Sequence, residues 1–119
     1  MDETRRERIS QRIIRELSEL LLRGEIKDPR VNTFVSFSFC KLAKDGSTAR
    51  IGVSTFMDTG TLDLAVAGLN SASGYLQSRI SRTIRLRQTP HIYFVPDHSI
   101  EQGQEVIRKI EQLDDSTEP

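Results

Sequence analysis

The stretch from Thr61 to Val95 constrains the fold of this chain more than any other. Its first half predicts a helix, because apolar residues recur at the spacing of one helical face, at Leu62, Ala65, Val66 and Leu69. The helix then meets residues 70–74, Asn-Ser-Ala-Ser-Gly. Four of these are weak helix formers, and a glycine costs about 1 kcal/mol relative to alanine in a helix. The apolar stripe resumes beyond them at Leu76, Ile80 and Ile84. We therefore predict two short helices that meet at a kink of small residues, followed by a strand.

The second of these helices carries positive charge beside the kink, with arginines at positions 79, 82, 85 and 87. Small side chains at the kink expose backbone amides at a helix N-terminus, which is a favourable place for an anion. Arg79 and Arg82 lie one turn apart and off the apolar stripe, so they can add phosphate contacts. The alternative is that Gly74 only caps a helix or permits close helix packing, with no ligand.

Length and composition indicate one ordinary globular domain. The chain has 119 residues, 36% of them hydrophobic and 29% charged. No apolar run approaches the roughly 20 residues of a membrane span, and the N-terminus lacks the apolar core of a secretory signal. Cys40 is the only cysteine, so an intrachain disulfide and a thiolate zinc cluster are excluded. We expect a cytoplasmic protein.

The formal net charge of zero hides an uneven distribution. Residues 1–87 hold fifteen of the seventeen basic residues and ten of the seventeen acidic ones. The remainder holds two basic residues against seven acidic ones. This pattern does not exclude a basic face, although charge alone favours solvated helix surfaces plus an acidic tail.

The first half of the chain predicts a helix and a hairpin. A helix from about Thr4 to Leu22 has its apolar side at Ile9, Ile13, Leu17, Leu20 and Leu21. A strand is expected over Val31–Leu42, with Val31, Val35, Phe37 and Phe39 on one face. After a turn at residues 44–47, a return strand is expected over Thr48–Phe56. Thr59 or Thr61 is expected to cap the following helix.

The second half ends in a strand and a helix. The strand is predicted over His91–Val95, and Ser99 is expected to cap a last helix. The apolar side of that helix is Ile100, Val106, Ile107, Ile110 and Leu113. Residues 1–113 then form one domain, and residues 114–119 a disordered acidic tail. The fold class is α+β, with a three-stranded sheet covered by helices on one face, and the strand order stays open.

Several motifs in this order resemble one family. They are KDPR at Lys27–Arg30, the segment N-x-A-x-G-Y-L at Asn70–Leu76, L-R-x-x-P-x-I-x-F at Leu86–Phe94, and D-x-S at Asp97–Ser99. Together they resemble ribosome-binding factor A over about residues 4–113. The resemblance implies a type II KH-like domain, α-β-β-α-kink-α-β plus a C-terminal helix, with an AxG kink at Ala72–Gly74. His91 departs from the acidic residue that relatives often have there, and we assign it no role.

The resemblance implies a function in late maturation of the small ribosomal subunit. The expected partners are 16S rRNA, near its 5′ end and the neck and decoding region, and the 30S subunit, with release before translation. It also implies 5′-end processing and importance in the cold. We expect a monomer that needs no cofactor, binds no membrane and has no small-molecule substrate. The residues expected to contact RNA are Ala72, Ser73, Gly74, Tyr75, Arg79, Arg82, Arg85, Arg5, Arg8, Arg12, Lys27 and Arg30.

Other residue patterns leave alternatives open. Asp97-His98-Ser99 contains the letters of a hydrolase triad, but adjacent residues do not converge on one substrate atom, and a turn explains them better. Arg87 can pair with a carboxylate or with RNA. Tyr75 and Tyr93 can stack on bases or pack at a rim. Cys40 is expected to be an inert apolar residue.

Two other classes of function compete with RNA binding. One is a protein–protein module without direct RNA contact, in which the arginines are merely solvated. The other is a small enzyme, for which the sequence offers no convergent set of polar groups, no phosphate loop and no paired-cysteine site. We therefore expect no catalytic or metal-binding residues.

Overall fold

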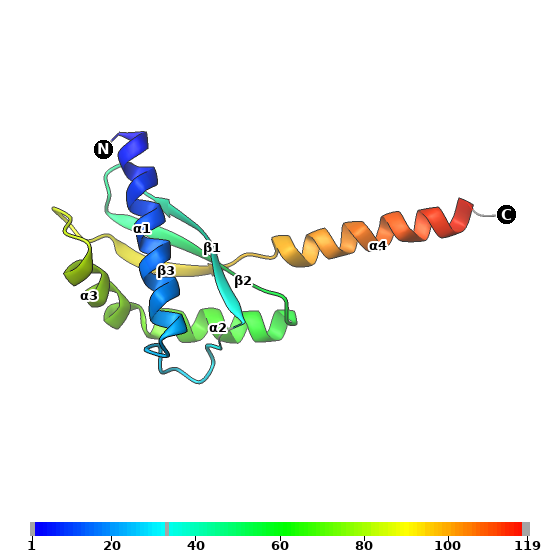
Figure 1. Cartoon of the computed structure of the whole chain (residues 1–119), viewed down its shortest axis with the longest axis horizontal. Helices are drawn as coiled ribbons and strands as arrows, with labels where there is room; N and C mark the ends of the chain where they lie inside the picture. The colour runs from blue at the N-terminus through cyan, green and yellow to red at the C-terminus, as the bar shows by residue number, and fades with distance from the viewer. Residues whose placement is uncertain (1, 33, 118–119) are drawn as a thin grey trace.

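The described residues form four helices and three strands, in the order α-β-β-α-α-β-α. The structure is a computed structural model that describes residues 2–32 and 34–117. The elements are α1 Glu3–Leu22, β1 Val35–Leu42, β2 Thr48–Thr55, α2 Thr59–Ser71, α3 Ser73–Thr83, β3 His91–Pro96 and α4 Ser99–Thr117. Figure 1 shows α1 crossing in front of the sheet and α4 extending away from it. This order confirms the α+β architecture expected from the sequence.

The sheet has the order β1-β2-β3, which the sequence had left open. β1 and β2 form an antiparallel hairpin, whereas β2 and β3 run parallel. A parallel pair needs a long crossover, and α2 and α3 supply it. This crossover places the kink between α2 and α3 beside the sheet.

Helices cover one face of this sheet. The buried apolar side chains of the strands point to that face, and they are Val35, Phe37, Leu42, Ala49, Ile51, Val53, Ile92 and Phe94. They form one core with the apolar stripes of α1, α2 and α3. The stripes proposed from the sequence are confirmed here, since Ile13, Leu17, Leu69, Leu76 and Ile80 are fully buried.

The first strand differs from its prediction in two ways. It begins at Val35 rather than at Val31, because residues 28–31 form a turn in which the Val31 amide donates to the Asp28 carbonyl. A β-bulge at Ser38, between Phe37 and Phe39, then reverses the facing of the residues that follow it. Cys40 and Leu42 therefore lie on the covered face, and Phe39 lies on the opposite face. The expectation that Phe39 shares a face with Val35 was wrong for this reason.

Two helix caps also differ from their predictions. Asp58, rather than Thr59 or Thr61, caps α2, and its Oδ1 accepts a hydrogen bond of 2.8 Å from the Thr61 amide. Aspartate is as good a cap as threonine, and here it comes first in the chain. At α4 the helix already includes Ser99, and Asp97 Oδ1 accepts a bond from the Ser99 amide at 3.0 Å.

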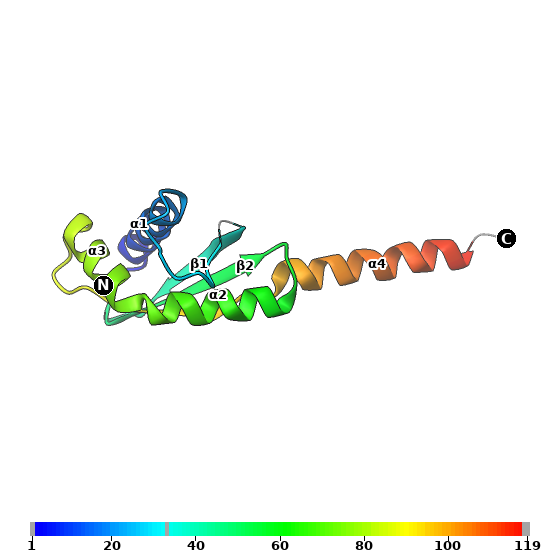
Figure 2. The same cartoon turned by 90° about the horizontal axis from the view of Figure 1, so that it is seen from below.

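α4 stands apart from the rest of the molecule. Figure 2 shows it projecting beyond the sheet and the other helices. Its apolar side is exposed at Val106, Ile107, Ile110 and Leu113. The helix runs on to Thr117, past Asp114, where the sequence analysis placed the start of a disordered tail; residues 118–119 lie outside the described part.

Candidate nucleic-acid interface

The kink expected from the sequence lies at Ala72, between α2 and α3. Its backbone has φ −90° and ψ 2°, which is a change of direction and not an open loop. No side chain caps the first turn of α3. The backbone amides at the N-terminus of α3 therefore receive no capping hydrogen bond from a side chain.

Gly74 lies in this first turn and has no internal reason to be glycine. A Cβ added there would meet nothing within 4 Å. Its φ is not positive, because only Gly24 and Gly46 have positive φ among the described residues. Neither the backbone conformation nor internal packing therefore requires glycine at position 74. Its lack of a side chain leaves the helix backbone accessible to a ligand. Tyr75, next to it, is 45% exposed.

The arginines of α3 fall into two groups. Arg79 forms an ion pair with Glu25, with Nη2 3.3 Å from Oε2. Arg82 and Arg85 are exposed and form no ion pair within the described ranges. Arg82 donates only long hydrogen bonds of 3.4 and 3.5 Å to Ser78. The charge of this segment that is available to a ligand therefore resides mainly in Arg82, in the last turn of α3, and in Arg85, just after the helix.

Hydrogen bonds of the Arg30 side chain connect the KDPR turn to the kink. Asp28 accepts hydrogen bonds from the Arg30 amide at 2.9 Å, from Nε at 3.0 Å and from Nη2 at 2.7 Å. These bonds to Arg30 lower the pKa of Asp28 to about 2. Arg30 Nη2 also donates to Ser71 Oγ at 3.1 Å, at the end of α2. Arg30 and Lys27, both expected as RNA contacts, are exposed, but the Arg30 guanidinium is hydrogen-bonded to Asp28 and Ser71.

A glycine permits this close approach of the turn to α2. A Cβ on Gly68 would lie 2.9 Å from a methyl group of Val31 and 3.1 Å from the Asp28 carboxylate. Between the turn and the kink lies a hollow of about 540 Å³, lined by Glu25, Lys27, Asp28, Ala72 and Tyr75. Its charged groups are of both signs, so the turn and the kink form one mixed surface.

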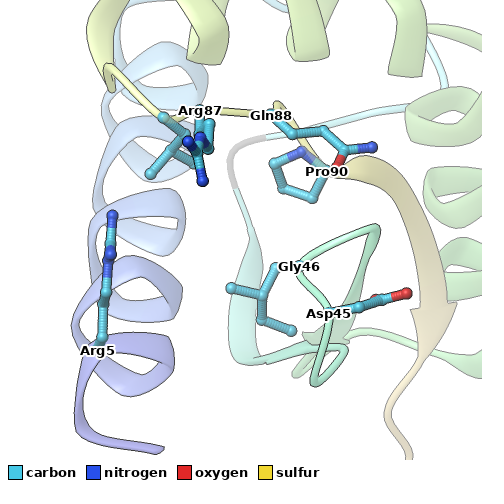
Figure 3. A pocket seen from close by; sticks show the side chains of 8 residues that line it. Arg5, Asp45, Gly46, Arg87, Gln88 and Pro90 are labelled. Atoms are coloured by element: carbon cyan, nitrogen blue, oxygen red, sulfur yellow. The ribbon is translucent and has the colours of Figure 1, made fainter. Parts of the chain in front are cut away.

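Arginines of α1 form a second basic strip. Arg5, Arg8 and Arg12, three of the residues expected to contact RNA, are exposed. Arg5 lines a hollow of about 250 Å³ together with Arg87, Asp45 and Gln88. Figure 3 shows the two arginines along the α1 side of this hollow and Asp45 on the hairpin side. Arg87 has no carboxylate partner in the described part of the chain, so the ion pair considered for it does not form.

Two amide side chains near the kink were missed by the sequence analysis. Asn70 Nδ2 donates to the Phe94 carbonyl at 3.0 Å, and the Phe94 amide donates to Asn70 Oδ1 at 2.8 Å. The Ile92 amide donates to Gln77 Oε1 at 3.3 Å. The two side chains hydrogen-bond to backbone groups on the edge of β3 that does not pair with β2. They thereby connect α2 and α3 to this strand. No local signal in the sequence marks such a role, because the partners are distant in the chain.

Other chemistry considered for the chain has a local explanation. Asp97 accepts a hydrogen bond of 2.6 Å from Ser38 Oγ, which lowers the pKa of Asp97. Burial raises the pKa of the Cys40 thiol to about 11. Within the described residues, no three His, Cys, Asp or Glu side chains are grouped so as to hold a metal ion. No described helix has both the length and the apolar character to span a membrane.

Comparison with known proteins identifies the family. The family model described as ribosome-binding factor A matches residues 5–110. A ribosome-binding factor A of Agathobacter rectalis is 42% identical over 106 residues, which covers 89% of this chain and 87% of that protein. The crystal structure of ribosome-binding factor A from Thermus thermophilus superposes with a TM-score of 0.64 at 26% identity, covering 76% of this chain and 94% of that one.

A further match comes from a homology model of the Thermus thermophilus factor, fitted into a cryo-electron-microscopy map of a 30S–RbfA complex. Its TM-score is 0.58 at 27% identity, covering 75% of this chain and 91% of that model. With a family match over nearly its whole length and a fold shared with solved relatives, this chain belongs to the ribosome-binding factor A family.

Proposed function

We propose that this protein is a non-enzymatic assembly factor that binds the 30S ribosomal subunit and contacts 16S rRNA through the surface around the α2–α3 kink. The observation that carries the proposal is its structural match to a factor fitted into a 30S complex. The family resemblance supports the finer parts, namely a monomeric cytoplasmic protein that promotes late maturation, including 5′-end processing, and that matters most in the cold.

The kink offers the chemistry that a phosphate backbone needs. Gly74 leaves helix backbone open to close approach, and the positive end of the α3 dipole lies at that point. At the other end of α3, Arg82 and Arg85 add charge that no carboxylate neutralises in the described structure. Contacts of this kind bind RNA through its backbone and fix the orientation of the protein without reading sequence.

A binding protein can guide RNA folding without catalysing a reaction. It shifts the population towards the arrangement that it binds better, by as much as its affinities for the two arrangements differ. Rearrangement of RNA slows as temperature falls, so such a shift has greater consequence in the cold. This accounts for assembly without an active site.

The test is cosedimentation with ribosomal subunits on a gradient. Arg82→Glu combined with Arg85→Glu should lower affinity for free 30S subunits by about tenfold or more, since it reverses two phosphate contacts. Arg79 is left unchanged because its substitution would also break the pair with Glu25. Binding of the unmodified protein should weaken steeply with salt and be weak to complete, translating ribosomes.

A matched control uses the other end of the molecule. Arg108→Glu with Lys109→Glu makes the same change in net charge on exposed positions of α4. It should leave cosedimentation close to that of the unmodified protein. Equal losses from both double variants would mean that net charge alone governs binding, and no loss from either would remove the kink surface from the proposal.

One observation favours the alternative of a protein–protein module. α4 exposes four apolar side chains on one side, with exposed fractions of 56% for Val106, 57% for Ile107, 53% for Ile110 and 66% for Leu113. Such a stripe suits a partner helix or groove. Association that is insensitive to salt and to ribonuclease would support this module in place of RNA contact.

A further inference from the structure

The face of the sheet opposite the helices is open and has its own composition. The strand register aligns Lys41, Arg50 and Tyr93 in one row across β1, β2 and β3. The next row holds Phe39, Gly52 and Val95. We call these six residues the open face. None of them was among the residues expected to bind RNA, although base stacking by Tyr93 was considered.

The bulge at Ser38 builds the centre of this face. It turns Phe39 away from the helices, and the Phe39 ring then lies directly on the backbone of Gly52. A Cβ at position 52 would collide with the ring, so glycine is required for this packing. The Phe39 ring therefore packs against the strands, and neighbouring side chains can contact it there.

Two cations gather around this ring. Arg50 Cζ lies 5.8 Å from the ring centroid and Lys41 Nζ lies 6.0 Å from it. Both distances are within the range of a cation–π contact. In the part of the chain that the structure describes, neither side chain pairs with a carboxylate, and Arg50 Nε has no hydrogen-bond partner.

Carboxylates near the two ends of the face are otherwise engaged. Asp97 accepts from Ser38, and Asp45 accepts from the Ser47 amide at 3.0 Å and from its hydroxyl at 2.7 Å. Within the described residues, Glu3 and Glu7 of α1 line one hollow with Lys41 and Arg6, without an ion pair to Lys41, so the unbalanced positive charge of the face resides mainly in Arg50. It is complementary to a polyanion.

Tyr93 supplies the aromatic surface beside these charges. It is 38% exposed and lies next to Arg50 on the neighbouring strand, about 4.8 Å away in backbone spacing. Unpaired RNA bases stack on tyrosine rings and on arginine guanidinium planes, while basic side chains follow the backbone. Two flat groups side by side with a lysine next to them match that pattern, and a double helix offers no exposed base faces to them.

We propose that the open face binds unpaired RNA, with bases stacked on Tyr93 and Arg50, phosphate contacted by Lys41, and Phe39 holding both cations in position. This site goes beyond the kink interface, because α2 and α3 pack against the covered face of the sheet. A factor with both sites contacts structured RNA through the kink and an unpaired strand through the sheet. The proposals for the two sites can be tested separately, and either can be wrong without the other.

Tyrosine fluorescence tests the proposal directly, because the chain has no tryptophan and only two tyrosines. Tyr75→Phe leaves Tyr93 as the only reporter, and Tyr93→Phe leaves Tyr75 at the kink. The probe is a single-stranded uridine oligomer of about 10 nucleotides, within the usual site size of such proteins. Stacking should quench Tyr93 in the first variant, and a fully paired RNA hairpin of equal charge should not.

Affinity of the same labelled oligomer, measured by anisotropy, provides the second readout. Tyr93→Ala should weaken binding about tenfold, whereas Tyr93→Phe should retain it because the ring is kept. Arg50→Gln should weaken binding and reduce the slope of log K against log salt by about 1. Arg108→Gln, which removes one charge from α4, should change neither the affinity nor the quenching.

Three results would overturn the proposal. They are quenching of Tyr75 without quenching of Tyr93, equal binding of the paired hairpin, and an unchanged affinity in Tyr93→Ala. The double variant Arg82→Glu with Arg85→Glu separates this proposal from the kink interface. It should lose 30S cosedimentation while quenching of Tyr93 by the oligomer persists.

Discussion

At the scale of single residues, the glycines of the helical segment have opposite roles. Gly68 permits the KDPR turn to contact α2, since a Cβ there would lie 2.9 Å from Val31. Gly74 has open space around it and ordinary backbone angles. The sequence alone shows both as glycine in a helix. Only their surroundings show that one is required by packing and that the other leaves a surface accessible.

Gly74→Ala should therefore stabilise the protein and weaken its function. Alanine is favoured over glycine in a helix by about 1 kcal/mol, which corresponds to about 2–5 °C in the thermal midpoint for a domain of this size. The added methyl group would stand where an RNA phosphate approaches. We expect a raised midpoint by circular dichroism together with weaker 30S cosedimentation.

Gly103→Ala is the matched control for this prediction. Gly103 also lies in a helix, α4, with nothing within 4 Å of an added Cβ. It should leave 30S binding unchanged. If Gly74→Ala binds as tightly as Gly103→Ala, close approach at the kink is not used in the complex.

At the scale of elements, β3 is held on both sides. Its backbone pairs with β2 on one side, and the amide side chains of Asn70 and Gln77 bond to its other edge. An unpaired edge strand is open to pairing with other chains. The kinked helices thus protect the edge of the strand that they connect to, and Asn70 joins the kink to the sheet.

Asn70→Ala should lower the free energy of unfolding by about 1–3 kcal/mol, because it leaves the amide and carbonyl of Phe94 without partners. Urea denaturation followed by circular dichroism measures this loss. Gln102→Ala, at an exposed position of α4, should change stability by less than about 0.5 kcal/mol. Equal effects of the two substitutions would show that the Asn70 bonds contribute little.

At the scale of the whole molecule, the shape is elongated. The Cα radius of gyration is 17.2 Å, and the extents are 65 × 36 × 19 Å. A compact chain of this length would have a radius of gyration of about 13.5 Å. The difference arises from α4, which extends away from the other elements (Figures 1 and 2).

This shape predicts that the apolar stripe of α4 contributes little to the stability of the isolated protein. Ile107→Ala with Ile110→Ala should shift the thermal midpoint by no more than about 2 °C, since both side chains are more than half exposed. Leu76→Ala, at a position with 0% exposure, should cost about 2–5 kcal/mol. A large loss in the α4 variant would mean that this helix packs against the body or against a second copy.

Much of the fold could be predicted from the sequence because its signals are local. The apolar stripes of α1, α2 and α3 follow the helical period, and the kink follows from five consecutive small or polar residues. The return strand predicted over Thr48–Phe56 agrees with β2, Thr48–Thr55, to within one residue. β1 was predicted less well, because a bulge adds one residue without any clear mark in the sequence.

The sequence by itself determined the order of elements, the kink and the family, since periodicity, caps and motifs act over a few residues. The tertiary structure decided which charges remain available to a ligand. Arg79 meets Glu25 across 54 positions, and Arg30 meets Ser71 across 41. Lys41 and Arg50 come together around Phe39 through the strand register. Contacts between residues so far apart in the chain depend on how the elements pack, and local sequence patterns carry no record of that packing.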